Sequence, residues 1–356
     1  MTPIHGTCAP AYDAVREAFA VVVDGAPAGS SLAIRYAGEL VVDLWGGPAG
    51  GGREWQHDTL VMPYSVSKPL AAVCALQLVD RGLVELDAPM RRYWAELRSQ
   101  ATVRQVLAHS AGLVLLEEPA PYEAFLDWTE LCDRLARQDS SWPPGTAVGE
   151  SALFYGHLVG ELVRRVDGRS LGRFLREEVA SPHGLDLHIG VPDADQGRVA
   201  DLVAGTGFTR AGGGPLRQAA TANPPGTDDM SLMNSRAWRA AEVPAINAHV
   251  TARSIALFYE LLASGRLLSP ATLAEMTRVQ ASGDDLVTGH PALWGLGVSV
   301  DPDGWGMGGI GGSFGCWSPA GGYAFAFTTA DLGTFDRVDA LENAFRAVVG
   351  LAPIVG

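Results

Sequence analysis

Apolar residues recur along this chain with two spacings, which separate strands near the two ends from helices between them. Tyr12–Val23 carries apolar residues on one side of a predicted helix. A hairpin is expected next, with strands over Ser31–Tyr36 and Leu40–Trp45 joined by a turn at Ala37-Gly38. The glycine-rich stretch Gly46–Gly52 has too little side-chain bulk for a strand and predicts a loop.

Helical spacing dominates the middle of the chain. A helix is predicted from Ser65 through Arg81, and Gly82 is a suitable C-terminal cap for it. Further helices are expected over Val103–Leu107, Tyr122–Arg137, Leu153–Val166, Leu171–Val179 and Thr251–Ser264. The segment Gly205–Asp229 is rich in glycine, alanine and proline and has few apolar anchors, so it predicts a loop.

Strand patterns return towards the C-terminus. They cover Trp294–Val300, Ser313–Trp317 and Tyr323–Thr329, and a last helix is predicted over Arg337–Val349. Strands at both ends with helices between them predict an α/β (α+β) fold, in which terminal helices flank an antiparallel sheet and a helical domain is inserted. We assign residues 1–65 and 290–356 to the sheet domain and 66–289 to the helical domain.

The composition narrows the range of partners. The 356 residues carry a net charge of −14, which argues against nucleic acid and anionic membranes as partners. No apolar run approaches the length of a membrane span, and Met1–Pro10 lacks the pattern of an export signal, so we expect a cytoplasmic protein. Cys8, Cys74, Cys132 and Cys316 are scattered, which argues against disulfides and structural zinc.

A single lysine stands out among the 26 basic residues, because all the others are arginine. It lies three positions after a serine, in Ser65-Val66-Ser67-Lys68. Lysine can lose its proton whereas arginine effectively cannot. An amine one helical turn from a hydroxyl is typical of a general base beside a nucleophile. A surface lysine in a chance Ser-x-x-Lys tetrapeptide is the alternative.

Three other patterns fit less well. Gly311-Gly312-Ser313-Phe314-Gly315 matches a nucleophile elbow, but that motif needs a later histidine, and the last histidine here is His290. The glycines of Gly306–Gly311 match a dinucleotide fingerprint, but no helix is predicted after them. His157 and Glu161 lack a third metal ligand and are interpreted as part of a solvated helix face, so no metal is expected. His109 is interpreted as a structural hydrogen-bonding residue.

Several separated segments together resemble one family. They are Pro63–Lys68, Leu107–Leu113, Pro144-Gly145-Thr146, the helix Tyr155–Val166, Gly168–Gly172 and Trp305–Gly309, and their order matches that of the serine β-lactamase and penicillin-recognising superfamily. The chain is most similar to its class C-like esterases (family VIII carboxylesterases) and related transacylases. The resemblance covers about residues 10–350 and implies the β-lactamase/DD-peptidase-like fold.

The resemblance also implies roles for individual residues. Ser65 would be acylated, Lys68 would assist its deprotonation, and the backbone N–H groups of Ser65 and Ile310 would form the oxyanion hole. The substrate would contact residues next to these motifs, namely Tyr64, Ser151, Trp305, Met307, Gly308 and Gly309.

Two positions depart from the family pattern. Glu150, in Glu150-Ser151-Ala152, stands where the family has a tyrosine-led triplet, so a carboxylate is expected at the position of the usual general base. Met307 stands where many members have lysine or histidine, which predicts weak binding of β-lactam carboxylates.

These observations predict an acyl-serine enzyme without cofactor or metal. It would cleave a small-molecule ester or activated carbonyl and pass the acyl group to an amine or alcohol acceptor, or to water. A plain family VIII carboxylesterase is one alternative. A catalytically inactive binding protein with the same fold is another.

Overall fold

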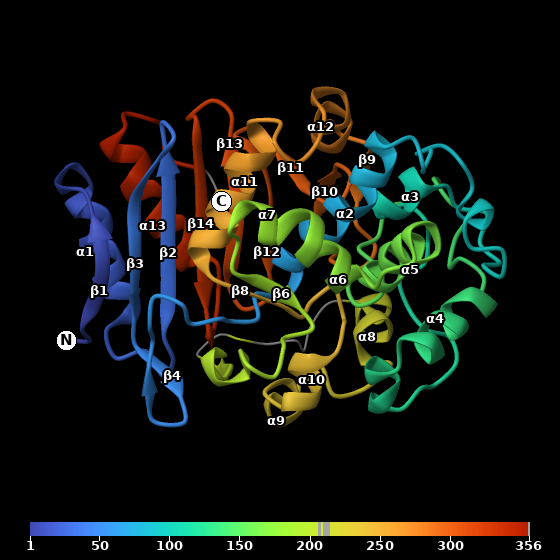
Figure 1. The fold of residues 1–356 in the computed structure, drawn as a ribbon, viewed down its shortest axis with the longest axis horizontal. Helices are drawn as coiled ribbons and strands as arrows, with labels where there is room; N and C mark the ends of the chain where they lie inside the picture. The colour runs from blue at the N-terminus through green and yellow to red at the C-terminus, as the bar shows by residue number, and fades with distance from the viewer. Residues whose placement is uncertain (206–207, 209–213, 355–356) are drawn as a thin grey trace.

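A computed structural model describes residues 1–205, 208 and 214–354 of this chain. Among these residues the main feature is a nine-stranded antiparallel sheet with the order β1-β3-β2-β14-β13-β12-β11-β10-β9 (Figure 1). The strands come from both ends of the chain: β1 (Ile4–Cys8), β2 (Ser30–Tyr36), β3 (Glu39–Gly46), β9 (Ala281–Asp284), β10 (Pro291–Trp294), β11 (Ser299–Asp301), β12 (Gly304–Gly309), β13 (Ser313–Ser318) and β14 (Tyr323–Thr329). The chain thus has the predicted α/β (α+β), β-lactamase/DD-peptidase-like fold.

Helices cover both faces of this sheet. The first and last helices, α1 (Asp13–Val23) and α13 (Asp336–Val348), share a buried cluster with alternate residues of β2, β3 and β14, such as Leu32 and Phe327. On the other face, α11 (Ala252–Ala263) packs closely against β13. A side chain at Gly315 would meet Ile255 of that helix at 2.5 Å, so the glycine sets the approach of helix and strand.

The remaining helices form a group beside the sheet (Figure 1). They are α2 (Lys68–Asp80), α3 (Val103–Leu107), α4 (Trp128–Arg137), α5 (Tyr155–Asp167), α6 (Leu171–Phe174), α7 (Ser181–His183), α8 (Pro215–Ala222), α9 (Met230–Met233), α10 (Arg236–Ala240) and α12 (Pro270–Thr277). Almost every residue of α2 is buried, which fits a helix that contacts both α5 and β12. The two-domain division at 65 and 290 remains a proposal, and β9 and α11 already join the sheet layer before residue 290.

Three small sheets complete the connections between these elements. They pair β4 (Pro48–Gly50) with β5 (Arg53–Glu54), β6 (Leu187–Ile189) with β8 (Ala248–Val250), and β7 (Val203–Ala204) with β15 (Asp331–Leu332). The prediction of a loop over Gly46–Gly52 was therefore wrong at its centre. Backbone pairing with the next few residues makes a short strand there despite the small side chains.

Several predicted helices and strands are interrupted. The helix expected over Tyr122–Arg137 breaks at Asp127, whose side chain accepts a hydrogen bond from the Glu130 N–H and begins α4, after a 3₁₀ helix over Tyr122–Leu126. The helix expected over Leu171–Val179 changes to a π-helix at Leu175–Ala180. The strand expected over Trp294–Val300 is two strands, β10 and β11, joined by a turn that contains Gly297 in a left-handed conformation.

The prediction of a loop over Gly205–Asp229 was also wrong in part. Residues 206–207 and 209–213 lie outside the described residues, but Pro215–Ala222 forms helix α8. None of the helices among the described residues is both long enough and apolar enough to cross a membrane.

Candidate active site

Ser65 and Lys68 meet where a tight turn leads into a buried helix. The predicted helix starts later than expected: Tyr64–Ser67 is a 3₁₀ turn, and α2 begins at Lys68. Ser65 is partly exposed, whereas the Lys68 side chain is fully buried. The Lys68 amine donates a hydrogen bond to the Ser65 Oγ at 2.7 Å. The turn thus presents the hydroxyl to solvent and keeps the amine directly behind it.

Glu150 joins these two residues from a distant part of the sequence. Its Oε1 lies 2.9 Å from the Lys68 Nζ and accepts a hydrogen bond from the Ser65 hydroxyl at 3.4 Å. The backbone carbonyls of Ala152 and Ala245 also accept from the Lys68 amine, at 3.2 and 3.4 Å. Every partner of this amine is an acceptor, so the geometry fits an ammonium ion paired with a carboxylate. The predicted trio of hydroxyl, amine and carboxylate is in contact.

His109 holds the segment that carries Glu150. Its Nδ1 accepts a hydrogen bond from the Ser151 N–H at 3.2 Å, and its backbone carbonyl accepts from the Gly149 N–H at 2.9 Å. The ring lies 4.4 Å from that of Trp294, between centroids, and burial lowers the pKa of His109 to about 3. A neutral imidazole can act as this acceptor at ordinary pH. His109 is therefore a structural residue, as its position in the sequence indicated.

The end of β12 passes close to the nucleophile turn because Gly309 has no side chain. A Cβ at Gly309 would lie 1.9 Å from the Pro63 carbonyl oxygen and 3.3 Å from the Ser65 nitrogen. This approach brings Ile310 to the same pocket as Ser65. The two backbone N–H groups predicted for the oxyanion hole thus belong to neighbouring segments.

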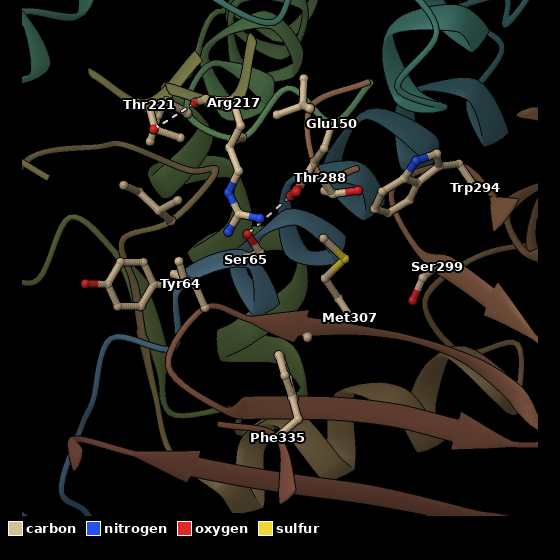
Figure 2. A pocket seen from close by; sticks show the side chains of 16 residues that line it. Tyr64, Ser65, Glu150, Arg217, Thr221, Thr288, Trp294, Ser299, Met307 and Phe335 are labelled. Atoms are coloured by element: carbon tan, nitrogen blue, oxygen red, sulfur yellow. Dashed lines mark hydrogen bonds between the residues drawn. The ribbon is translucent and has the colours of Figure 1, made fainter. Parts of the chain in front are cut away.

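A cavity of about 300 Å³ opens in front of Ser65. Its walls include most of the residues predicted from the sequence: Tyr64, Ser65, Glu150, Met307, Gly308 and Ile310. Figure 2 shows Met307 entering from β12 and Glu150 from the opposite side of Ser65. The wall is largely apolar, so an uncharged acyl group can bury its carbon atoms there.

Three predicted substrate-binding residues lie elsewhere. The Ser151 hydroxyl points away from the cavity and donates to the Leu113 carbonyl at 2.8 Å. Trp305 lies two residues before Met307 on β12, is buried against Tyr259 and does not line the cavity. Gly309 faces Pro63 and Ser65 instead of the cavity, so it shapes the site through backbone packing.

Other residues of the wall were not predicted from the sequence. They are Ala152, Leu153, Arg217, Thr221, Ile246, Val287, Thr288, Trp294, Ser299 and Phe335. Arg217 and Thr221 lie on α8, in the segment predicted to be a loop. Pro215 at the first helical position, followed by good helix formers, was the available signal. Arg217 also places a cation in the pocket. The prediction of weak binding of β-lactam carboxylates was based on Met307 and did not include this positive charge.

The interpretation of His157 and Glu161 as a solvated face was wrong. Both side chains are buried, because α2 and α4 both pack against α5. The Glu161 carboxylate accepts from the Trp128 indole at 2.8 Å and pairs with Arg164 and Arg165 at 2.7 Å. Within the described residues no cluster of three or more histidine, cysteine, aspartate or glutamate side chains could hold a metal ion.

The competing serine is excluded by its surroundings. Ser313 lies on β13, its side chain is 3% exposed, and its Oγ accepts a hydrogen bond from the Thr329 N–H at 3.2 Å. It does not line the cavity. The cavity, the exposed hydroxyl and the buried ion pair all coincide at Ser65.

Comparison with known proteins places this arrangement in a family. The sequence profile of the family described as Beta-lactamase matches residues 15–348. The chain belongs to the beta-lactamase family. It is 33% identical over 360 residues to the esterase/beta-lactamase LipL of Mycobacterium tuberculosis, covering 91% of this chain and 82% of LipL. It is thus an enzyme of the serine-hydrolase type that esterases and β-lactamases share.

Two further similar proteins are informative. A crystal structure of a family VIII carboxylesterase superposes with a TM-score of 0.90 at 36% identity, covering 97% of this chain and 100% of that one. A monacolin J acid methylbutanoyltransferase of Aspergillus terreus is 26% identical over 155 residues, which are 36% of this chain and 38% of the transferase. The proteins to which this chain is similar thus include both hydrolases and an acyl transferase.

Proposed function

We propose that this chain is a carboxylesterase-like acyl-serine enzyme that forms a covalent ester on Ser65 and passes the acyl group to an amine, an alcohol or water. The observation that carries the proposal is the contact of three groups at the cavity. The Lys68 amine lies 2.7 Å from the Ser65 hydroxyl oxygen and 2.9 Å from the Glu150 carboxylate. Similarity to LipL and to a family VIII carboxylesterase supports an ester as the acyl donor.

In the acylation step, the Ser65 oxygen attacks the ester carbonyl and its proton passes to Glu150. The hydroxyl already donates towards the Glu150 Oε1, at 3.4 Å. The Lys68 ammonium donates to the same oxygen, so its charge stabilises the developing alkoxide. The backbone N–H groups of Ser65 and Ile310 stabilise the tetrahedral oxyanion. When the carbonyl re-forms, the ester C–O bond breaks and the departing alkoxide takes the proton from Glu150.

The second step transfers the acyl group to an acceptor. A carboxylate is a weak base towards water, whereas the free-base form of an amine is a strong nucleophile without much assistance. Glu150 in place of a tyrosine base therefore favours an amine acceptor over water. Partial similarity to an acyl transferase agrees with this direction. A plain carboxylesterase is the second candidate, which similarity to the family VIII structure favours.

Acylation of Ser65 is tested by intact-mass spectrometry with a p-nitrophenyl ester. We expect an acyl adduct that maps to Ser65 in the wild type and is absent in Ser65→Ala. Ser313→Ala is the matched control, because Ser313 is buried outside the cavity and its variant should still be labelled. An adduct elsewhere would contradict the proposed nucleophile. No adduct with any activated ester would leave the inactive binding protein.

The acceptor is tested by product partitioning. With a p-nitrophenyl ester and millimolar primary amine, we expect amide to form at the expense of the free acid, while release of p-nitrophenol identifies total turnover. If the ratio of amide to acid is the same as in the uncatalysed reaction, transfer fails and the plain carboxylesterase is left.

A further inference from the structure

Arg217 gives the cavity a positive charge that the proposed chemistry does not use. Its side chain extends from α8 into the cavity, and Figure 2 shows the guanidinium directed towards Ser65. Glu150 is the other charged residue in the described cavity wall, and it is already paired with Lys68. Because Lys68 and Glu150 together are neutral, the described residues give the site a net positive charge of one, which comes from Arg217.

No carboxylate among the described residues balances this arginine. Within the part of the chain that the structure describes, Arg217 forms no ion pair. Residues 206–207 and 209–213, outside that part, include no aspartate or glutamate. An arginine half-buried in a largely apolar wall gives up part of its hydration, which is unfavourable unless an anion takes its place. The guanidinium fork matches a carboxylate, which it can bind through two parallel hydrogen bonds.

Hydroxyl groups beside Arg217 add to this anion site. Thr221, one helical turn further along α8, and Thr288 both line the cavity. The Thr288 hydroxyl can donate a hydrogen bond to an oxygen of the same carboxylate, and the Thr221 hydroxyl, which donates to the Arg217 carbonyl at 2.9 Å, adds a polar neighbour. We propose that the ester substrate carries a carboxylate that Arg217 binds, so that this enzyme prefers anionic esters to neutral ones. This inference rests on the proposed function, since it names the class of ester that Ser65 attacks.

The test compares esters that differ only in charge. One pair places the carboxylate on the acyl side: p-nitrophenyl hydrogen glutarate and p-nitrophenyl methyl glutarate. The other places it on the leaving group: 4-acetoxybenzoate and its methyl ester. For at least one pair we expect the ratio of kcat/KM values, anionic over neutral, to fall by about 10- to 100-fold in Arg217→Gln, the range of one charge-assisted contact. Arg217→Lys, which keeps the charge without the fork, should lie between the two.

Arg236→Gln is the matched control, because Arg236 is an exposed arginine on a neighbouring helix, α10, and is paired with Asp193 outside the cavity. It should leave both ratios as in the wild type. Added salt should reduce the preference of the wild type but not that of Arg217→Gln. The inference is overturned if Arg217→Gln changes the anionic and neutral members of both pairs equally, or changes neither.

A binding measurement keeps this inference separate from the proposed function. In Ser65→Ala, calorimetry with 4-acetoxybenzoate and its methyl ester reports affinity without acyl transfer. We expect the anion to bind more tightly, and Ser65→Ala/Arg217→Gln to lose about 10-fold or more of that difference. If the wild type acylates no ester, the proposed function fails while this binding arm still decides the anion site. If it acylates esters but the ratio of anionic to neutral substrates does not depend on Arg217, only the anion site fails.

Discussion

At the scale of single residues, the Lys68 amine stands between two oxygens with different tasks. In our proposal the Ser65 oxygen becomes the nucleophile and the Glu150 oxygen receives its proton, and they lie 2.7 and 2.9 Å from this amine. The lysine and the glutamate form an ion pair in the resting site. In our proposal these two residues assist deprotonation of the serine in place of a neutral amine beside a phenol. The carboxylate is thus the base in our proposal, and the ammonium acts by its charge.

This division of work predicts the behaviour of Glu150→Gln. The amide keeps the shape and can still accept from Lys68, but it cannot take the Ser65 proton. We expect the rate of acylation at pH 7, measured by the burst of p-nitrophenol, to fall by about 100-fold or more. Glu54→Gln, at an exposed position, is a control that should not change the rate. Full activity in Glu150→Gln would show that Glu150 is not the base and does not stand at the position of the family's tyrosine.

At the scale of elements, the end of β12 and the nucleophile turn must lie against each other for an oxyanion hole to form. Gly309 makes that contact, since its α-carbon faces the Pro63 carbonyl where a side chain would collide. The contact joins a strand of the C-terminal half to a turn from the N-terminal third. It determines the distance between the N–H groups of Ser65 and Ile310.

Gly309→Ala should therefore impair chemistry more than folding. A methyl group 1.9 Å from the Pro63 oxygen forces β12 away from Ser65, and loss of one oxyanion donor costs about 100- to 1,000-fold in kcat. The expected loss of stability is about 1–3 kcal/mol. Gly197→Ala is the control, because nothing lies within 4 Å of a Cβ at that position. Kinetics with a p-nitrophenyl ester and denaturant titration measure the two effects, and an unchanged kcat would refute the role of this contact.

The helices and strands also show how much of this structure and its candidate site can be predicted from the sequence. Ser65 and Lys68 were predicted from the spacing of the Ser-x-x-Lys motif, and Glu150 was predicted from the resemblance to the family's second motif. Arg217 was missed, because few apolar residues mark α8 and its one buried residue is Ala220. His157 and Glu161 were wrongly predicted to face solvent. Helix α5 is buried almost all round, so polar residues on this helix do not indicate solvent exposure. Which face of a helix is covered depends on its neighbours, and helix periodicity does not contain that information.

At the scale of the whole molecule, buried histidines link stability to pH. His157 and His249 are at most 1% exposed, and burial lowers the pKa of each from 6.5 to about 3. Unfolding exposes the rings, which then bind protons near pH 6.5, while the folded protein keeps them neutral. The unfolded state therefore gains protons, and the fold loses stability, as the pH falls from about 6.5 towards 3.

We expect each of these histidines to reduce the free energy of unfolding by about 1 kcal/mol between pH 7.5 and 5.5. Buried carboxyl groups with raised pKa, such as Glu342, stabilise the fold as the pH falls further, which opposes the effect of the histidines. The test therefore compares the change in the free energy of unfolding between variants. His157→Phe, which keeps a ring against Trp128, should lose less stability on acidification than the wild type, measured by denaturant unfolding at both pH values. His57→Gln, at an exposed site, should follow the wild type. If all three proteins lose the same free energy of unfolding between the two pH values, the link between buried histidines and pH is disproved.

The central pairing of β2 with β14 has a consequence for synthesis on the ribosome. It joins residues 299 positions apart, such as Ser30 and Thr329, and β2 has no other neighbour on that side. At translation rates of about 5–20 residues per second, the hairpin β2–β3 waits roughly 15–60 seconds with an unpaired edge. Exposed edges pair with other chains. The nascent protein is therefore vulnerable to aggregation until its last strands emerge, and slow translation or a shortage of chaperones should lower its yield before any step of catalysis is affected.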